Sequence, residues 1–93
     1  MKAKYLVIIE KGGTNYSAYS PDIPGCMATG KTVEETIDEM RSVITFHLEG
    51  MVENGEELPA PRSLSDFLNE TDEISDNDIL TSIETDLPVL ANV

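Results

Sequence analysis

Two side chains in this sequence have the chemistry of a covalent catalyst. They are the thiol of Cys26 and the imidazole of His47, and each is the only one of its type. A cysteine nucleophile needs a histidine within hydrogen-bond reach and a third group that orients this histidine. His47 falls at the border of an apolar helical stripe and Cys26 follows a proline-glycine turn, where partly or fully buried structural residues are the ordinary occupants. We therefore expect no Cys–His catalysis and predict that the chain is not an enzyme.

Carboxylates are the second group that could do chemistry, because several crowd one segment. They are Asp72, Glu73, Asp76 and Asp78. A calcium loop of the EF-hand type needs acids at alternate positions, a following glycine and a distal glutamate. The run Asp76-Asn77-Asp78-Ile79 does not continue in that way, and the chain has no glycine-rich phosphate loop ending in lysine-serine. We predict a solvated acidic surface, with no metal and no cofactor.

The net charge of -12 comes mostly from one half of the chain. Residues 1–50 hold seven acids and five bases, whereas residues 51–93 hold eleven acids and one base, Arg62. Nonspecific affinity for nucleic acid comes from Lys and Arg, so this balance argues against a duplex-binding surface and favours a basic protein as partner. The 93 residues contain one cysteine and no run of ~20 apolar residues, which predicts a single cytoplasmic domain without membrane contact.

Three short strands are expected before residue 30. Tyr5 to Ile9 is a continuous apolar run, typical of a strand that is buried on both faces and central in its sheet. A Gly-Gly turn leads to a second strand over Tyr16 to Ser20, and Cys26 to Thr29 forms a third. The turn before the third strand is assigned a structural role, because prolines fix a bend and glycine relieves its sterics. Its residues are Pro21, Asp22, Pro24, Gly25 and Cys26.

One long amphipathic helix is expected to cover the sheet. Thr32 suits its N-cap with Glu35 reaching back as a capping box, and Asn54-Gly55 suits its C-terminal end. Apolar residues recur at spacings of four and three along one face. They are Val33, Ile37, Met40, Ile44, Leu48 and Met51.

The rest of the chain is predicted to hold a minor helix, an acidic loop and a last strand. Ser63 to Leu68 suits a short helix with Leu64, Phe67 and Leu68 facing inward, and Asn69 to Asp78 suits a solvated loop. Ile79 to Leu87 fits either a strand or a helix by periodicity, and its β-branched content favours the strand.

These elements predict an α+β fold. We expect a two-layer sandwich of the order β-β-β-α-β, in which three or four mainly antiparallel strands are covered by one long helix. Within one domain, residues 1–55 form the core, residues 56–78 an acidic linker with a short helix, and residues 79–88 the C-terminal strand.

The order of these pieces resembles the HicB family of antitoxins. The resemblance covers Tyr5 to Pro61 and lies in the Gly-Gly hairpin, in Tyr16-Ser17-Ala18-Tyr19-Ser20-Pro21-Asp22-Ile23-Pro24-Gly25-Cys26, and in the run from Leu48 to Pro61 that closes the helix. The segment Ile83 to Pro88 is similar to the last strand common in that family. The resemblance implies a truncated ribonuclease-H-like fold without catalytic activity. It also implies a partner of the HicA type, a small basic ribonuclease toxin with the fold of a double-stranded-RNA-binding domain.

On both grounds we expect the chain to bind a basic HicA-like toxin and to neutralise it by masking its RNA-binding and active surface. Many members of the family append a helix-turn-helix or ribbon-helix-helix segment, whereas only five residues follow Pro88 here, so we expect no direct DNA binding. Phe67 and Ile74 are expected to act as apolar anchors among acidic contacts. The expected contact residues are Asp66, Phe67, Glu70, Asp72, Glu73, Ile74, Asp76 and Asp78.

The last strand also predicts a homodimer or a higher oligomer. Its alternation leaves an edge able to pair with another copy of the chain. The residues of this edge strand are Ile79, Thr81, Ile83, Thr85 and Leu87.

One other function stays open. A stand-alone RNA- or DNA-binding regulatory module would use the lysines of the first half, and its affinity would weaken steeply with salt. A ribonuclease-H-like enzyme is not expected, because it would need clustered carboxylates that hold Mg²⁺, and the expected strands offer only Glu10, Glu84 and Asp86, which are too few and too near the strand ends.

Overall fold

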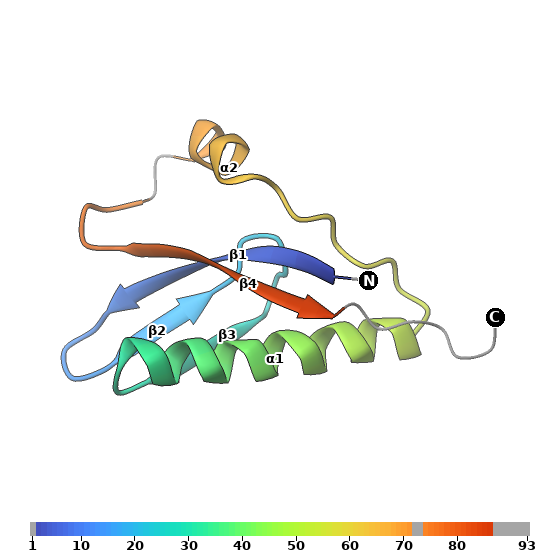
Figure 1. Ribbon diagram of the computed structural model, residues 1–93, viewed down its shortest axis with the longest axis horizontal. Helices are drawn as coiled ribbons and strands as arrows, with labels where there is room; N and C mark the ends of the chain where they lie inside the picture. The colour runs from blue at the N-terminus through green and yellow to red at the C-terminus, as the bar shows by residue number, and fades with distance from the viewer. Residues whose placement is uncertain (1, 72–73, 87–93) are drawn as a thin grey trace.

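The computed structural model describes residues 2–71 and 74–86. Its elements follow the predicted order and confirm the α+β class (Figure 1). They are β1 (Lys2–Lys11), β2 (Tyr16–Tyr19), β3 (Met27–Gly30), α1 (Val33–Glu53), α2 (Leu64–Glu70) and β4 (Ile79–Asp86). None of the helices in this described part is long and apolar enough to cross a membrane.

The four strands form one antiparallel sheet in the order β3-β2-β1-β4. β1 is central, as its apolar run predicts, and Val7, Ile8 and Ile9 are fully buried. β1 pairs with β4 from Lys2 to Ile9, which explains why β1 is longer than the predicted Tyr5 to Ile9. β3 and β4 are the two edges of the sheet.

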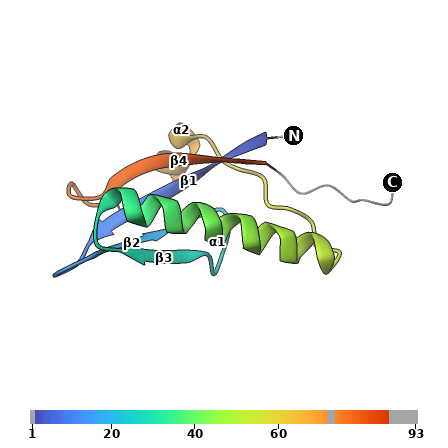
Figure 2. The same cartoon turned by 60° about the horizontal axis from the view of Figure 1, so that its bottom comes forward.

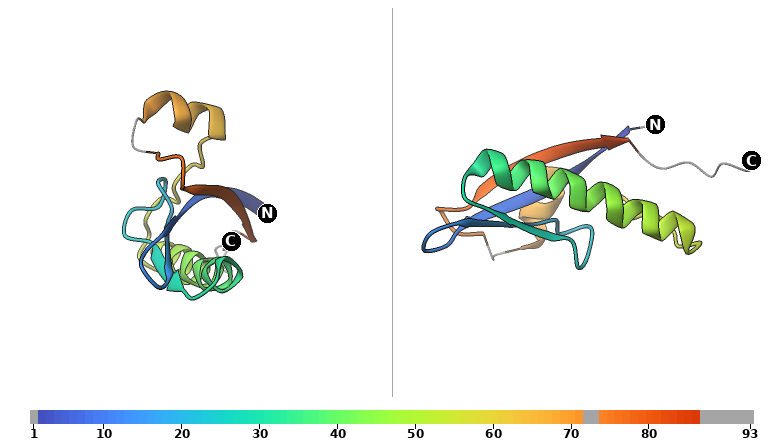
Figure 3. Two further views of the ribbon diagram at one scale, coloured as in Figure 1. Left: turned by 90° about the vertical axis from the view of Figure 1, so that its left-hand side faces the viewer. Right: turned by 90° about the horizontal axis from the view of Figure 1, so that it is seen from below.

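The two faces of the sheet are covered to different extents. Tyr5, Val7 and Ile9 join the cluster that α1 covers, whereas Leu6 and Ile8 pack with Phe67 of α2 on the other side. Figure 2 shows α1 lying along the sheet, and Figure 3 shows α2 on the face away from α1. The predicted two-layer sandwich is therefore confirmed for the α1 face, and the seven-residue helix α2 adds a partial third layer.

Local signals in the sequence account for the position of α1. The Thr32 hydroxyl accepts from the Glu35 amide at 3.0 Å, and the Glu35 carboxylate accepts from the Lys31 amide at 2.9 Å. This is the predicted capping box, except that Glu35 reaches one residue further back than the cap. The helix ends at Asn54 and Gly55, and Gly55 has a φ of 74°.

The predicted orientation of α2 is wrong in part. Leu64 and Leu68 are 45% and 46% exposed instead of facing inward, and only Phe67 is buried. A helix of two turns on a narrow sheet presents one side chain to it, and three apolar positions in the sequence do not say which. The helix also runs two residues past the predicted Leu68, and β3 begins at Met27 rather than at Cys26.

Candidate partner-binding surface

The acidic residues predicted to contact a partner lie on and after α2. Asp66 is exposed in the first turn of α2, where its amide donates to the Ser63 hydroxyl at 3.1 Å. Asp76 is exposed, and Asp78 is half-buried with its carboxylate accepting from the Ser75 amide at 3.0 Å. The predicted contacts Asp72 and Glu73 lie outside the described residues, as does Leu87 of the predicted edge strand.

Phe67 is a core residue, which contradicts its prediction as an apolar anchor for a partner. Its side chain is 6% exposed and packs with Leu6 and Ile8. Ile74, the second predicted anchor, is half-buried against the same cluster. The exposed apolar side chains of α2 are instead Leu64 and Leu68.

The charge of Glu70 is paired with Arg62 of the same chain. Arg62 donates from Nη1 to the Glu70 carboxylate at 2.7 Å and from Nε to the Asp22 carboxylate at 2.6 Å. Its backbone amide donates to the second Asp22 oxygen at 2.7 Å, and its guanidinium lies 5.2 Å from the ring centroid of Phe67. The hydrogen bonds to Asp22 and Glu70 raise the pKa of Arg62 above its usual range. Arg62 therefore ties the linker, α2 and the proline turn together.

Three residues of the proline turn, Asp22, Gly25 and Cys26, have a structural explanation. The Asp22 side chain is only 6% exposed because Arg62 covers it, and Gly25 has a φ of 81°, which favours glycine. The amide of Cys26 donates to the Ile23 carbonyl at 3.2 Å, and both residues are buried. Burial raises the pKa of the Cys26 thiol to about 11, so the thiol stays protonated at neutral pH and is a poor nucleophile.

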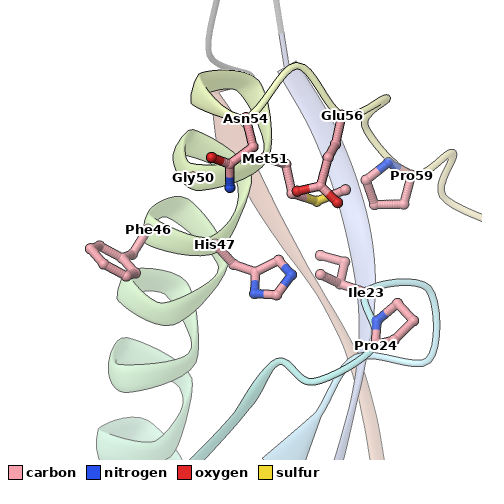
Figure 4. A pocket seen from close by; sticks show the side chains of 9 residues that line it. All are labelled: Ile23, Pro24, Phe46, His47, Gly50, Met51, Asn54, Glu56 and Pro59. Atoms are coloured by element: carbon pink, nitrogen blue, oxygen red, sulfur yellow. The ribbon is translucent and has the colours of Figure 1, made fainter.

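Two grooves lie on either side of this turn and share Ile23 and Pro24. The groove beside α1 has a volume of about 490 Å³ and is lined by His47 (Figure 4). The groove on the α2 side has a volume of about 400 Å³ and is lined by Cys26 and Phe67. His47 and Cys26 thus line different grooves. Within residues 2–71 and 74–86, no group of three or more His, Cys, Asp or Glu side chains is placed to hold a metal ion.

The groove beside α1 was missed by the sequence analysis. One residue gave a signal: Phe46 falls off the apolar stripe of α1 and is 78% exposed. The wall formed by the proline turn and the linker could not be inferred, because it depends on contacts between residues far apart in the chain.

β4 lies at an edge of the sheet, where a second strand would pair with its backbone groups rather than with its side chains. Ile83 and Thr85 are buried toward α1, where the Thr85 hydroxyl lies 3.4 Å from the Thr45 hydroxyl. Ile79 is exposed and Thr81 is half-buried. Pairing of this edge with a second copy stays a prediction.

Comparisons with known proteins agree with this architecture. The chain is 37% identical over 83 residues, 89% of its length, to an uncharacterised 14.9 kDa protein of Haemophilus phage HP1, and it spans 61% of the length of that relative. The crystal structure of the N-terminal domain of the Burkholderia pseudomallei antitoxin HicB has a TM-score of 0.78 and 27% identity, over 91% of this chain and 100% of that one. A chain of the HicA3 and HicB3 toxin–antitoxin complex has a similar fold, with a TM-score of 0.67 and 24% identity, over 86% of this chain and 94% of that one.

The family assignment rests on nearly the whole sequence. The family described as HicB-like antitoxin of bacterial toxin–antitoxin systems matches residues 5–92. The match includes the hairpin, the proline turn, α1, α2 and β4, and the HicB domain structure has the same sheet and covering helix. The chain belongs to the HicB-like antitoxin family.

Proposed function

We propose that this chain binds a HicA-type ribonuclease toxin and neutralises it by masking the surface that binds RNA. The proposal is supported by membership of the HicB-like antitoxin family and by similarity to a chain from a HicA3 and HicB3 complex. The observation that carries it is the concentration of acid after residue 50, where eleven carboxylates accompany one base. That base, Arg62, is already paired with Asp22 and Glu70.

An acidic surface acts on a basic RNA-binding partner in two ways. It accelerates encounter by long-range attraction, and it competes with RNA phosphates for the same Lys and Arg side chains. Asp66 and Asp76 are exposed and make no ion pair among the described residues, so their charge is directed to solvent. The contact surface in this proposal consists of Asp66, Glu70, Asp72, Glu73, Ile74, Asp76 and Asp78.

The arrangement of the sheet favours inhibition without catalysis. Glu84 lies opposite Lys4 in the pairing of β1 with β4, and Asp86 lies opposite Lys2. Glu10 is six residues from Lys4 along β1, which corresponds to about 20 Å in a strand. Glu10 is therefore too far from Glu84 to share one magnesium ion with it, so the three strand carboxylates do not form the cluster that a ribonuclease-H-like mechanism needs.

The same pairing disfavours RNA binding through the sheet by the chain alone. Lys2 and Lys4 face the acidic β4 residues across the strand pair, and Lys2 forms an ion pair with Glu84 at 3.5 Å. An alternating surface of opposite charges attracts a polyphosphate backbone weakly, because neighbouring carboxylates offset each lysine.

The experiment measures the rate at which this chain associates with a purified toxin of the HicA type. The test variant replaces three of the proposed contact acids by asparagine. They are Asp66, Asp72 and Asp76. We expect the association rate at low salt to fall about tenfold or more, because charged interface groups act mainly on encounter. An unchanged rate would contradict the proposed surface.

A control variant removes the same number of charges from other parts of the molecule. It replaces the exposed residues Glu10, Glu34 and Glu39 by glutamine, which changes the net charge equally. We expect a rate change within about threefold, because these charges contribute only to the general field of the protein. Equal losses in both variants would mean that net charge alone attracts the partner.

A further inference from the structure

The groove beside α1 has mainly apolar walls. Ile23 and Pro24 come from the proline turn, Met51 from α1, and Pro59 from the linker (Figure 4). The groove has a volume of about 490 Å³, enough for a large side chain of another protein. In Figure 4 the space lies between α1 on one side and the turn and linker on the other, with His47 pointing into it from the helix.

Gly50 has no side chain, so the backbone of α1 is accessible from this groove. A glycine inside a helix is less favourable than an alanine, so its presence calls for a reason in the packing. Here the packing gives none, because a Cβ built on Gly50 meets nothing within 4 Å. The consequence of having no side chain at this position is that another molecule can approach the backbone of α1.

Phe46 stands at the rim of the groove. Its ring is 78% exposed and points outward from the helix, and every other exposed position of α1 is Glu, Asp, Arg or Ser. Single exposed apolar residues are ordinary on protein surfaces. Phe46 also lines the groove that Met51 and Pro59 line, although its ring points away from them in Figure 4. A partner that covers both the rim and the groove would remove these apolar side chains from water.

The charge around the groove selects the kind of partner. Glu49 and Glu53 follow Phe46 by three and seven positions and so share its side of α1, and Glu56 lines the groove itself. No Lys or Arg occurs between Arg41 and Arg62 in the sequence. A second copy of the chain would bring the same acids against these, whereas a basic protein would find complementary charge.

We propose that this groove receives a bulky apolar side chain, flanked by lysine or arginine, from the basic toxin. The inference rests on the proposed function, because it names a docking site for the same partner. Ile23 and Pro24 line both this groove and the groove that reaches Phe67 and Thr71 at α2, so the two surfaces adjoin through the proline turn. A partner held at the acidic surface of α2 therefore has this groove within its reach.

The first test fills the groove from the helix. Gly50→Leu adds a side chain where the Cβ has open space, so the fold should be kept, which circular dichroism and urea unfolding verify. We expect the dissociation constant for a purified toxin of the HicA type to rise at least tenfold. Gly50→Ala, which adds only a methyl group, should change it less than threefold. Equal affinity for the wild type and Gly50→Leu would overturn the inference.

The second test removes the aromatic ring. Phe46→Ala should weaken binding about tenfold, because the ring is exposed in the free chain and its loss leaves the core intact. The matched control is Glu34→Ala, which truncates another exposed side chain of α1 that lines neither groove. The control should bind within about threefold of the wild type. Equal effects of Phe46→Ala and Glu34→Ala would count against the groove.

The outcomes separate this inference from the function on which it rests. A wild-type chain that does not bind the HicA-type toxin overturns the proposed function, and the inference with it. A wild type that binds, with Gly50→Leu and Phe46→Ala binding equally well, overturns only the groove. If Gly50→Leu leaves toxin affinity unchanged and turns an oligomer into a monomer in sedimentation, the groove holds a second copy, and the inference is wrong.

Discussion

The two ends of α1 differ in how closely the rest of the chain packs against them. At the N-terminal end the Thr32 hydroxyl and the Glu35 carboxylate both accept backbone amides, and β3 approaches so closely that a Cβ on Gly30 would lie 2.7 Å from the Thr36 amide nitrogen. At the C-terminal end Phe46 is exposed, and a Cβ on Gly50 would touch nothing. Packing therefore requires a glycine at residue 30, beside the N-terminal end of α1, but not at residue 50, near its C-terminal end.

This difference separates the residues that maintain the fold from those that are free to bind. Close packing at Gly30 and the capping hydrogen bonds hold the start of α1 against the end of β3. No such constraint explains the open groove at Gly50, and residues that the fold does not use are the first candidates for a partner. Three substitutions test the comparison, at Gly30 of β3, at the N-cap Thr32 and at Gly50 of α1.

The largest effect is expected at Gly30. In Gly30→Ala the new methyl group would meet Thr36 Oγ1 at 2.6 Å and the Thr36 backbone, so β3 or α1 must shift. Overpacking of this kind costs about 1–3 kcal/mol in the free energy of unfolding. Urea unfolding measures this cost, with Gly13→Ala as the control because its Cβ meets nothing within 4 Å. Equal stability of the two variants would show that the close approach does not matter.

A smaller loss is expected at the helix cap. Thr32→Ala removes the hydroxyl that accepts the Glu35 amide, and loss of such a cap costs about 1 kcal/mol. Thr32→Ser keeps the hydroxyl and should retain most of the stability. The free energy of unfolding from urea titration checks both variants. If alanine and serine gave the same value, the cap would not be stabilising the N-terminal end of α1.

The smallest effect, of opposite sign, is expected at Gly50. Gly50→Ala should raise the free energy of unfolding by up to about 1 kcal/mol, because alanine is the better helix former and meets no neighbour. Thermal and urea unfolding measure the gain. A loss of stability at this position would mean that the fold needs the glycine, which would remove the contrast between the two ends of α1.

The sequence was sufficient where structure follows from local signals. The apolar run in β1 indicated a central strand, and Thr32, Glu35 and Gly55 marked the ends of α1 through hydrogen bonding and a φ that favours glycine. The alternation and β-branched content of Ile79 to Asp86 identified β4.

The sequence was insufficient where contacts are distant in the chain. Nothing in the pattern pairs Arg62 with Asp22, forty residues away, and this pair is what holds the linker and α2 against the turn. The burial of Phe67, rather than of Leu64 or Leu68, depends on how α2 sits over Leu6 and Ile8. The groove beside α1 is also lined by this linker, so its presence could not be predicted from local patterns. Only the position of Phe46 off the apolar stripe of α1 indicated a binding surface.

RNA cleavage by a purified toxin of the HicA type tests the central claim most directly. The measurement follows cleavage of a single RNA while the wild-type chain is added in increasing amounts. The account predicts that cleavage stops at a fixed ratio of the two proteins, and that a higher concentration of Gly50→Leu is needed for the same protection. Undiminished cleavage in the presence of excess wild-type chain would contradict the account.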